Sequence, residues 1–158
     1  MSAVLVQHRR HRRRADVPEG PESAHAVSDA RFWSLWAQRH FPWALLEEGA
    51  SVLLLESWSS GSRLTWLAQA RDVLHATVAS RREVVAAVAG WSGQAPDAVE
   101  SSDYLRGSAV ESGVVLGWRP TPLTWLGAPR PDGLRVERNG WAVVRTEDLR
   151  AWGIDLAR

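Results

Sequence analysis

The chain has 158 residues, 45% of them hydrophobic, and a formal net charge of +1 at pH 7. This length and composition are typical of one globular domain. No cysteine is present, which excludes disulfides, thiolate catalysis and cysteine-ligated zinc. No apolar run approaches the roughly 20 residues of a membrane span, and residues 1–27 lack the apolar stretch of a secretory signal. We therefore expect a soluble, cytoplasmic protein.

The first 27 residues differ from the rest in composition. They contain few large apolar side chains and a run of arginines, which are the candidate phosphate contacts: Arg9, Arg10, Arg12, Arg13 and Arg14. Such a segment buries too little to offset its ordering entropy, so we predict a disordered basic tail at 1–27 and one globular domain at 28–158. The alternatives are a solvated leader without a binding role, or a misassigned start.

The charge is divided unevenly between these two parts. The tail carries five arginines against three acidic residues, whereas residues 28–158 carry 14 arginines against 15 acidic residues. A protein that grips duplex nucleic acid through many phosphates usually has a basic body. Any nucleic-acid contact is therefore expected from the tail or from a local pocket.

The first predicted elements are a helix and two strands. Ser28 is a suitable N-cap for a helix that carries Phe32, Trp33, Leu35 and Trp36 and stops before Pro42. A strand is predicted from Ser51 to Trp58, followed by a Ser-Ser-Gly-Ser turn. A long strand then runs from Arg63 to about Thr77.

The middle of the chain predicts a second helix and another strand. Ser80 and Glu83 form a capping box at the start of the helix, and Gly93 is its expected end. A short helical turn begins at Pro96, and residues 101–109 read as loop. A strand from Val110 to Arg119 leads into residues 120–133, which their prolines keep extended, as an edge or rim.

The last predicted elements are a hairpin and a short helix. Asn139-Gly140 favours a two-residue turn that pairs Arg138 with Trp141 and Val136 with Val143. Thr146 is expected to cap the closing helix. The sum is an α+β fold with a mostly antiparallel sheet that forms a small barrel or a curled sheet.

This order of elements resembles the PUA-like superfamily, in particular its ASCH and EVE branches. The resemblance rests on three stretches that cover about half of residues 28–158: Leu46–Leu55 (LEEGASVLLL), Leu64–His75 with the capped helix after it, and Gly113–Pro131 (GVVLGWRPTPLTWLGAPRP). It implies a pocket at one end of a barrel that accepts a base, often a modified one, or a nucleoside-like ligand. The lysine-containing signatures of the catalytic members are absent, so it implies binding rather than catalysis.

Ten tryptophans are more than a domain of this size hides easily, so some of them should line a groove. Flat aromatic walls suit nucleobases, which stack on them whatever their sequence. Trp58 is the preferred stacking residue, because the hydroxyls of Ser57, Ser59 and Ser60 could bond the edge of a base. The alternative is that Trp58 caps the core at a hairpin.

A second aromatic wall is predicted from Trp118 and Trp125, with Arg119 as a guanidinium partner. Arg119 could instead neutralise Glu111 or Glu56. The remaining tryptophans on predicted inner stripes are expected in the core: Trp33, Trp36, Trp66, Trp91 and Trp152.

Signals for catalysis are weak in this sequence. His75 reads as a structural histidine, the adjacent Glu47 and Glu48 diverge in direction, and no nucleophile, phosphate loop or metal signature is present. We expect no catalytic residue, metal or cofactor. The hypothesis is a non-enzymatic module that recognises a nucleobase, modified or not, in DNA or RNA. The alternative is a protein-interaction or small-molecule-binding domain, and the sequence leaves the oligomeric state open.

Overall fold

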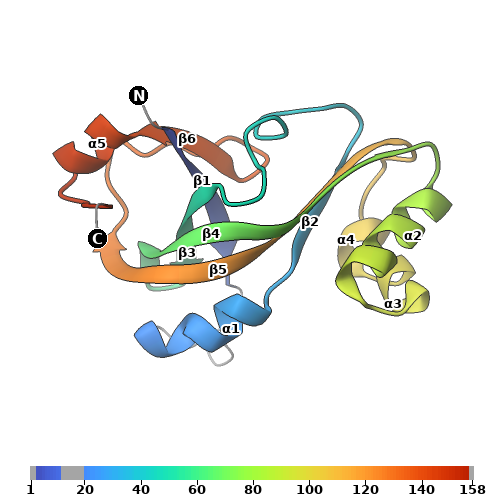
Figure 1. The fold of residues 1–158 in the computed structure, drawn as a ribbon, viewed down its shortest axis with the longest axis horizontal. Helices are drawn as coiled ribbons and strands as arrows, with labels where there is room; N and C mark the ends of the chain where they lie inside the picture. The colour runs from blue at the N-terminus through green and yellow to red at the C-terminus, as the bar shows by residue number, and fades with distance from the viewer. Residues whose placement is uncertain (1–2, 12–19, 157–158) are drawn as a thin grey trace.

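The computed structural model describes residues 3–11 and 20–156 (Figure 1). Its centre is one six-stranded sheet in the order β2-β5-β4-β3-β1-β6. The strands are β1 (Ala3–Arg10), β2 (Phe32–Trp36), β3 (Ser51–Trp58), β4 (Gly61–Val78), β5 (Gly113–Pro129) and β6 (Trp141–Arg145). All neighbours pair antiparallel except β1 and β3. The α+β class with a mostly antiparallel sheet is confirmed, but β2 and β6 are edges of an open sheet, so the barrel is not closed.

Short helices surround the sheet (Figure 1). They are α1 (Ala24–Asp29), α2 (Arg81–Ser92), α3 (Pro96–Glu100), α4 (Asp103–Arg106) and α5 (Thr146–Ala151), and a 3-10 turn (Pro21–Ser23) precedes α1. Helices α2 to α4 gather beside one end of β4 and β5, and α5 lies toward the other. Within the described ranges, no helix has the length and apolar character needed to cross a membrane.

The prediction of a disordered tail is wrong for residues 3–10, which form β1. Val4, Leu5 and Val6 are buried, because β1 lies between β3 and β6 and pairs with both. Three consecutive apolar residues suffice here, since the strand is covered on both faces. The arginines that follow them dominated the composition of the segment. Arg12, Arg13 and Arg14 lie outside the described residues.

The prediction of a helix starting at Ser28 is also wrong. Helix α1 ends at Asp29, and Phe32–Trp36 forms β2, which pairs with β5 from Phe32↔Trp118 to Trp36↔Val114. The segment Phe-Trp-Ser-Leu-Trp is rich in aromatic residues that favour a half-buried strand. Its apolar spacing fits helix and strand almost equally, and the free edge of β5 decides between them.

The hairpin of β3 and β4 and the second helix are confirmed. The backbone N–H of Glu83 donates to Ser80 Oγ at 3.3 Å, which caps α2 as predicted. Gly93 follows α2 with φ +77, in the left-handed conformation that glycine favours. Pro96 begins α3.

Residues 101–109 and 120–133 are more regular than predicted. Helix α4 forms in the first segment because Ser102 Oγ accepts from the backbone N–H of Leu105. In the second segment, β5 continues along β4 as far as Pro129. Its pairing with β2 ends at Trp118, so β5 is an edge strand beyond that point and tolerates proline there.

The turn at Asn139-Gly140 exists, but with a different register. The backbone N–H of Glu137 donates to the Trp141 carbonyl at 2.9 Å, so three residues form the loop and the predicted Arg138–Trp141 pair is wrong. Gly140 has φ +86, as expected of a three-residue loop that ends in a left-handed glycine. Asn139 Nδ2 donates to the Phe41 carbonyl at 2.5 Å, which ties this loop to the segment after β2. Thr146 is the first residue of α5 rather than its cap.

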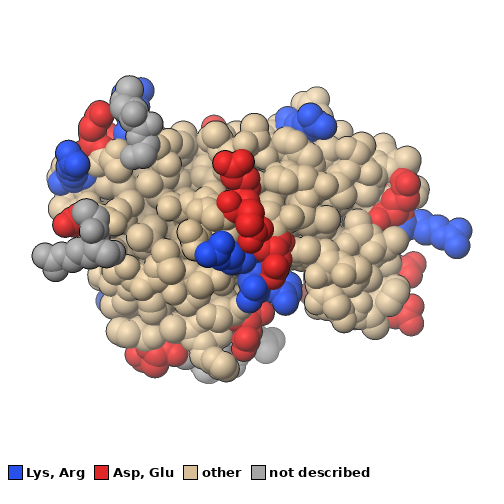
Figure 2. All heavy atoms as spheres, viewed as in Figure 1, with Lys and Arg blue, Asp and Glu red and all other residues tan. Residues whose placement is uncertain are grey.

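Two apolar clusters cover the two faces of the sheet. The outer face carries Val4, Val6, Leu53 and Leu55 and packs against Leu149 of α5. The inner face carries the buried tryptophans Trp66, Trp118 and Trp141. A third cluster joins α2, α3 and α4 to the far ends of β2, β4 and β5. On the visible surface, acidic and basic side chains lie close together across the middle and uncharged atoms cover most of the rest (Figure 2).

Candidate functional site

The inner face is curled, so that strands from opposite ends of the sheet meet across it. The ring centroids of Trp118 on β5 and Trp141 on β6 are 5.7 Å apart. The guanidinium carbon of Arg9 on β1 lies 4.3 Å from the centroid of the Phe32 ring on β2. Strand β2 is one edge of the sheet, whereas β1 and β6 lie at the other end of the strand order. The sheet therefore encloses a space between its two ends.

That space contains a pocket of about 240 Å³, which we call the aromatic pocket. Strands β1, β2, β5 and β6 and helix α4 all contribute to it. Its lining residues are Gln7, Arg31, Phe32, Trp33, Ser34, Tyr104, Leu116, Trp118 and Trp141. Five of these nine side chains are aromatic, and one, that of Arg31, is charged.

The aromatic walls are fixed by contacts among themselves. The rings of Phe32 and Trp118 are 5.2 Å apart and tilted by 35°. Trp33 and Tyr104 meet edge to face at 4.9 Å, a favourable geometry for aromatic pairs. The hydroxyl of Tyr104 accepts from the backbone N–H of Leu35 at 2.9 Å, which anchors α4 to β2. The pocket is thus formed before any ligand enters it.

Two polar atoms of the pocket lack partners. Gln7 Oε1 and Trp118 Nε1 are buried and make no hydrogen bond to any residue in the described part of the chain. One is an acceptor and the other a donor. Buried polar groups are nearly always paired, and leaving one unpaired costs about 1–3 kcal/mol. Two such atoms in one aromatic pocket are what a ligand with a complementary edge would satisfy.

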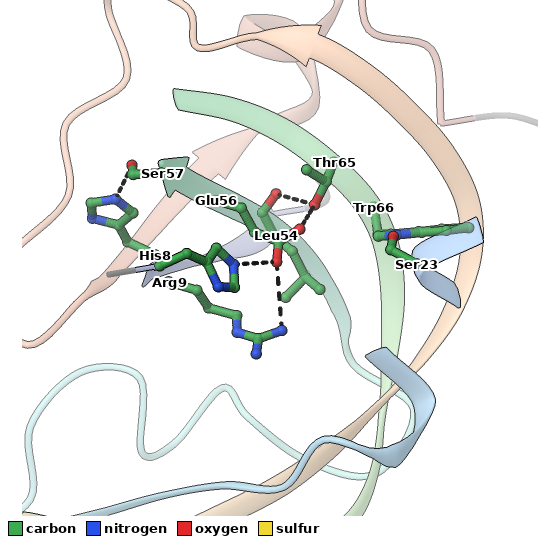
Figure 3. A network of polar contacts seen from close by, with 9 residues as sticks. His8, Arg9, Ser23, Leu54, Glu56, Ser57, Thr65 and Trp66 are labelled. Carbon is green, nitrogen blue, oxygen red and sulfur yellow. Dashed lines mark hydrogen bonds and ion pairs between the residues drawn. The ribbon is translucent and has the colours of Figure 1, made fainter. Parts of the chain in front are cut away.

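Beside the pocket, a polar network surrounds the buried carboxylate of Glu56 (Figure 3). His11 Nε2 lies 2.8 Å from Glu56 Oε1, and Thr65 Oγ1 donates to Glu56 Oε2 at 2.5 Å. Arg9 Nη1 is 3.6 Å from the same carboxylate. Burial lowers the pKa of the Arg9 guanidinium, and the charge of Glu56 opposes that shift. Both oxygens of the Glu56 carboxylate are therefore engaged, and their contact with Arg9 helps to hold its guanidinium beside Phe32.

Trp58, the predicted stacking residue, has no open ring face. It is 8% exposed, and its ring stacks on His11 at 5.1 Å and 19°. The position of Trp58 agrees with the alternative prediction, in which Trp58 caps the core at a hairpin. Ser57 Oγ is bonded to His8 and Ser62 instead of facing Trp58, while Ser59 and Ser60 are exposed in the turn.

The second predicted wall does not assemble, because Trp118 and Trp125 both belong to the inner cluster but pack on different aromatic rings. Trp118 lines the aromatic pocket, although it is only 1% exposed. Arg119 Nε donates to Asp72 Oδ2 at 2.8 Å, so its acidic partner is neither Glu111 nor Glu56. Trp125 packs edge to face on Trp66, with centroids 5.3 Å apart. The three residues do not form one site.

The other predicted core residues divide into buried and half-buried ones. Trp66 is buried, and its Nε1 donates to Ser23 Oγ at 2.8 Å. The remaining four are half-buried: Trp33, Trp36, Trp91 and Trp152. His75 Nε2 lies 3.0 Å from the Trp43 carbonyl, which is a structural contact. Glu48 accepts from the backbone of Asp72 and Val73.

Sequence reasoning missed most of the aromatic pocket, namely Gln7, Phe32, Trp33, Tyr104 and Trp141. One signal was available for Gln7, because this polar residue shares the inner side of a strand with the apolar Leu5. In the described part of the chain, no group of three histidine and acidic residues is arranged to hold a metal ion. A scan of family models, a search of curated proteins and a search of solved structures each found no match to this chain.

Proposed function

We propose that this domain is a non-enzymatic nucleic-acid-binding module that holds one nucleobase in the aromatic pocket. The observation that carries the proposal is the pair of unpartnered atoms, Gln7 Oε1 and Trp118 Nε1, in a pocket with five aromatic side chains. Its volume of about 240 Å³ is below the 300–1,000 Å³ of pockets for drug-sized ligands. One planar ring system is a ligand of suitable size.

The chemistry of the walls fits a base in two ways. Phe32, Trp33 and Tyr104 keep part of their surface exposed in the pocket, and exposed aromatic rings stack on the faces of any base, which contributes about 1–3 kcal/mol per base. The edge of a base carries N–H donors beside carbonyl or ring-nitrogen acceptors. Gln7 Oε1 would accept from such a donor, and Trp118 Nε1 would donate to the neighbouring acceptor. A base extruded from its stack is read by this combination of stacking and edge contacts.

The charges favour a local contact with a single strand over a broad one with a duplex. Arg31 is the one charged side chain among the described residues that line the pocket. Acidic and basic side chains are interspersed on the face drawn in Figure 2. Affinity for duplex DNA comes largely from many phosphate contacts on a basic face. The resemblance to PUA-like domains, with their preference for modified bases, forms part of this proposal.

The experiment is calorimetric titration with the four nucleosides and with short single-stranded oligonucleotides at two salt concentrations. Trp118→Phe keeps an aromatic ring but removes the donor, and it should weaken binding about threefold to tenfold. Trp152→Phe is the matched control, because Trp152 packs against the outer cluster. Equal effects of the two substitutions, or no binding of any nucleoside or oligonucleotide at low salt, would refute the proposal.

One observation favours the alternative, a protein-interaction or small-molecule-binding domain. A groove of about 520 Å³ lies beside β6, and Leu45 and Val143 line it with 49% and 48% of their surface exposed. An apolar contact there would respond little to salt, whereas phosphate-driven binding weakens steeply as salt rises. Binding that weakens between the two salt concentrations of the titration therefore favours the nucleic-acid-binding module. Binding that stays unchanged favours the alternative.

A further inference from the structure

A chain of polar side chains crosses the outer face of the sheet at the end of β1. His8 Nε2 lies 2.6 Å from Ser57 Oγ, and Ser57 Oγ lies 2.6 Å from Ser62 Oγ. Strands β1, β3 and β4 each contribute one of these residues. Figure 3 shows His8 and Ser57 directed toward one another, apart from the network around Glu56.

Two arginines place positive charge around these three polar side chains. Arg10 is the register partner of Ser57 across β1 and β3. The backbone N–H of Arg130 donates to the Ser62 carbonyl at 3.3 Å, and Arg130 Nη2 donates to the Leu134 carbonyl at 3.0 Å. Each guanidinium keeps further N–H donors beyond these bonds.

The charged groups that act on His8 are of one sign. Burial lowers the pKa of His8, and the positive charges of Arg10 and Arg130 lower it further. Glu56, the acidic neighbour of Ser57 on β3, is directed to the inner face, where it binds His11 and Thr65. Among the described residues, no carboxylate contributes to the shift of His8. The field around His8 therefore lacks a negative counter-charge.

We propose that His8, Arg10, Ser57 and Arg130 form a phosphate-binding site on the outer face of the sheet. A phosphate oxygen accepts hydrogen bonds from guanidinium and hydroxyl groups, and the planar fork of arginine matches two such oxygens. The site is separate from the aromatic pocket, because His8 and Gln7 are adjacent in a strand and face opposite sides of the sheet. It therefore stands whether or not the pocket binds a base.

Binding of phosphate should be coupled to the protonation of His8. A dianion next to the imidazolium stabilises the charged form and raises the pKa of His8 from its lowered value. By linkage, the protonated protein binds phosphate more tightly than the neutral one by the same factor. A rise of one pKa unit corresponds to about tenfold tighter binding at low pH.

The experiment is an NMR titration of His8 in the full chain, with inorganic phosphate or with sodium chloride of the same ionic strength. We expect phosphate, but not chloride, to raise the pKa of His8. Arg130→Gln should reduce this rise, and Arg130→Lys, which keeps the charge but loses the fork, should reduce it less. The matched control is Arg106→Gln, an exposed arginine of α4 at the other end of the sheet.

Equal pKa values in phosphate and chloride, or an unchanged phosphate response in Arg130→Gln, would overturn the proposal. The same holds if Arg106→Gln reduces the response as much. Single-stranded oligonucleotides distinguish the source of the phosphate. A shift at micromolar oligonucleotide assigns the site to a nucleic-acid backbone, whereas a shift with inorganic phosphate alone assigns it to free phosphate or a phosphomonoester.

Discussion

The amide oxygen of Gln7 and the indole nitrogen of Trp118 lie in the wall of one pocket, and neither has a partner within residues 3–11 and 20–156. Gln7 belongs to β1 and Trp118 to β5, which β3 and β4 separate in the sheet. Unpaired buried polar groups destabilise the folded state. The free domain therefore carries a destabilising feature at the place where a ligand would remove it.

Gln7→Met tests this relationship directly. Methionine keeps the length of the side chain and removes the unpaired amide, so the free energy of unfolding should rise by about 1 kcal/mol. The same change should weaken binding of the proposed nucleobase, since an acceptor is lost. Chemical denaturation and calorimetric titration measure the two effects. If Gln7→Met instead destabilises the free protein, the amide has a structural role.

Glu56→Gln should destabilise the fold strongly. It leaves Arg9 and His11 beside a neutral amide, and removing one partner of a buried ion pair typically costs about 3–5 kcal/mol. Glu111→Gln is the matched control, because Glu111 pairs with Arg81 at the surface with 76% of its side chain exposed. A surface pair contributes about 0–1 kcal/mol. Urea unfolding of both variants compares the two positions, and similar midpoints would contradict a stabilising role for Glu56.

Acid should destabilise the protein through His8. Its pKa is lowered below 6.5 in the folded state, so the unfolded chain binds the proton more tightly. The contribution of His8 to the free energy of unfolding is present above pH 6.5 and is lost as the pH falls through the lowered pKa. Urea midpoints at pH 7.5 and pH 5 measure this loss. In His8→Gln, the urea midpoint should fall less between pH 7.5 and pH 5 than it does in the unmodified protein. An equal fall in both proteins would exclude His8 as the source of the acid destabilisation.

Gly113→Ala should prevent stable folding, because the structure leaves no room for the methyl group of alanine at this position. Gly113 has φ +152, and a Cβ there would overlap the carbonyl oxygen of Trp36 in β2. Gly90→Ala is the control, since a Cβ at this helical position meets nothing within 4 Å. Alanine in α2 should stabilise the protein by about 1 kcal/mol. Thermal unfolding followed by circular dichroism should show a lower midpoint for Gly113→Ala, if it folds at all, and a higher midpoint for Gly90→Ala. An unchanged midpoint for Gly113→Ala would contradict the close approach of Gly113 to Trp36.

Local signals predicted those elements whose cause lies within a few residues. Ser80 caps α2 through Glu83, and Gly93 ends it, because both interactions span a single helical turn. The strand Ser51–Trp58 and the turn after it are predicted for the same reason. Phe32–Trp36 is different, since its strand conformation depends on β5, far along the chain.

The aromatic pocket could not be predicted because it depends on the curl of the whole sheet. Gln7, Tyr104 and Trp141 come from distant parts of the chain and meet only after β1 pairs with both β3 and β6. The sequence predicts Trp118 as part of an aromatic wall with Arg119 as its partner. In the structure it is a buried wall, and alternation along β5 directs the two side chains to opposite faces.

The position of β1 between β3 and β6 also bears on how the chain is synthesised. Strand β1 leaves the ribosome long before its partner β6, because the two paired strands lie far apart in the chain. Closing so long a stretch of chain is entropically unfavourable and slows folding. Until β6 and α5 arrive, the outer apolar cluster and one edge of β1 stay exposed to other nascent chains, a condition that favours aggregation. Expression yield should therefore depend on how quickly β6 is synthesised and pairs with β1.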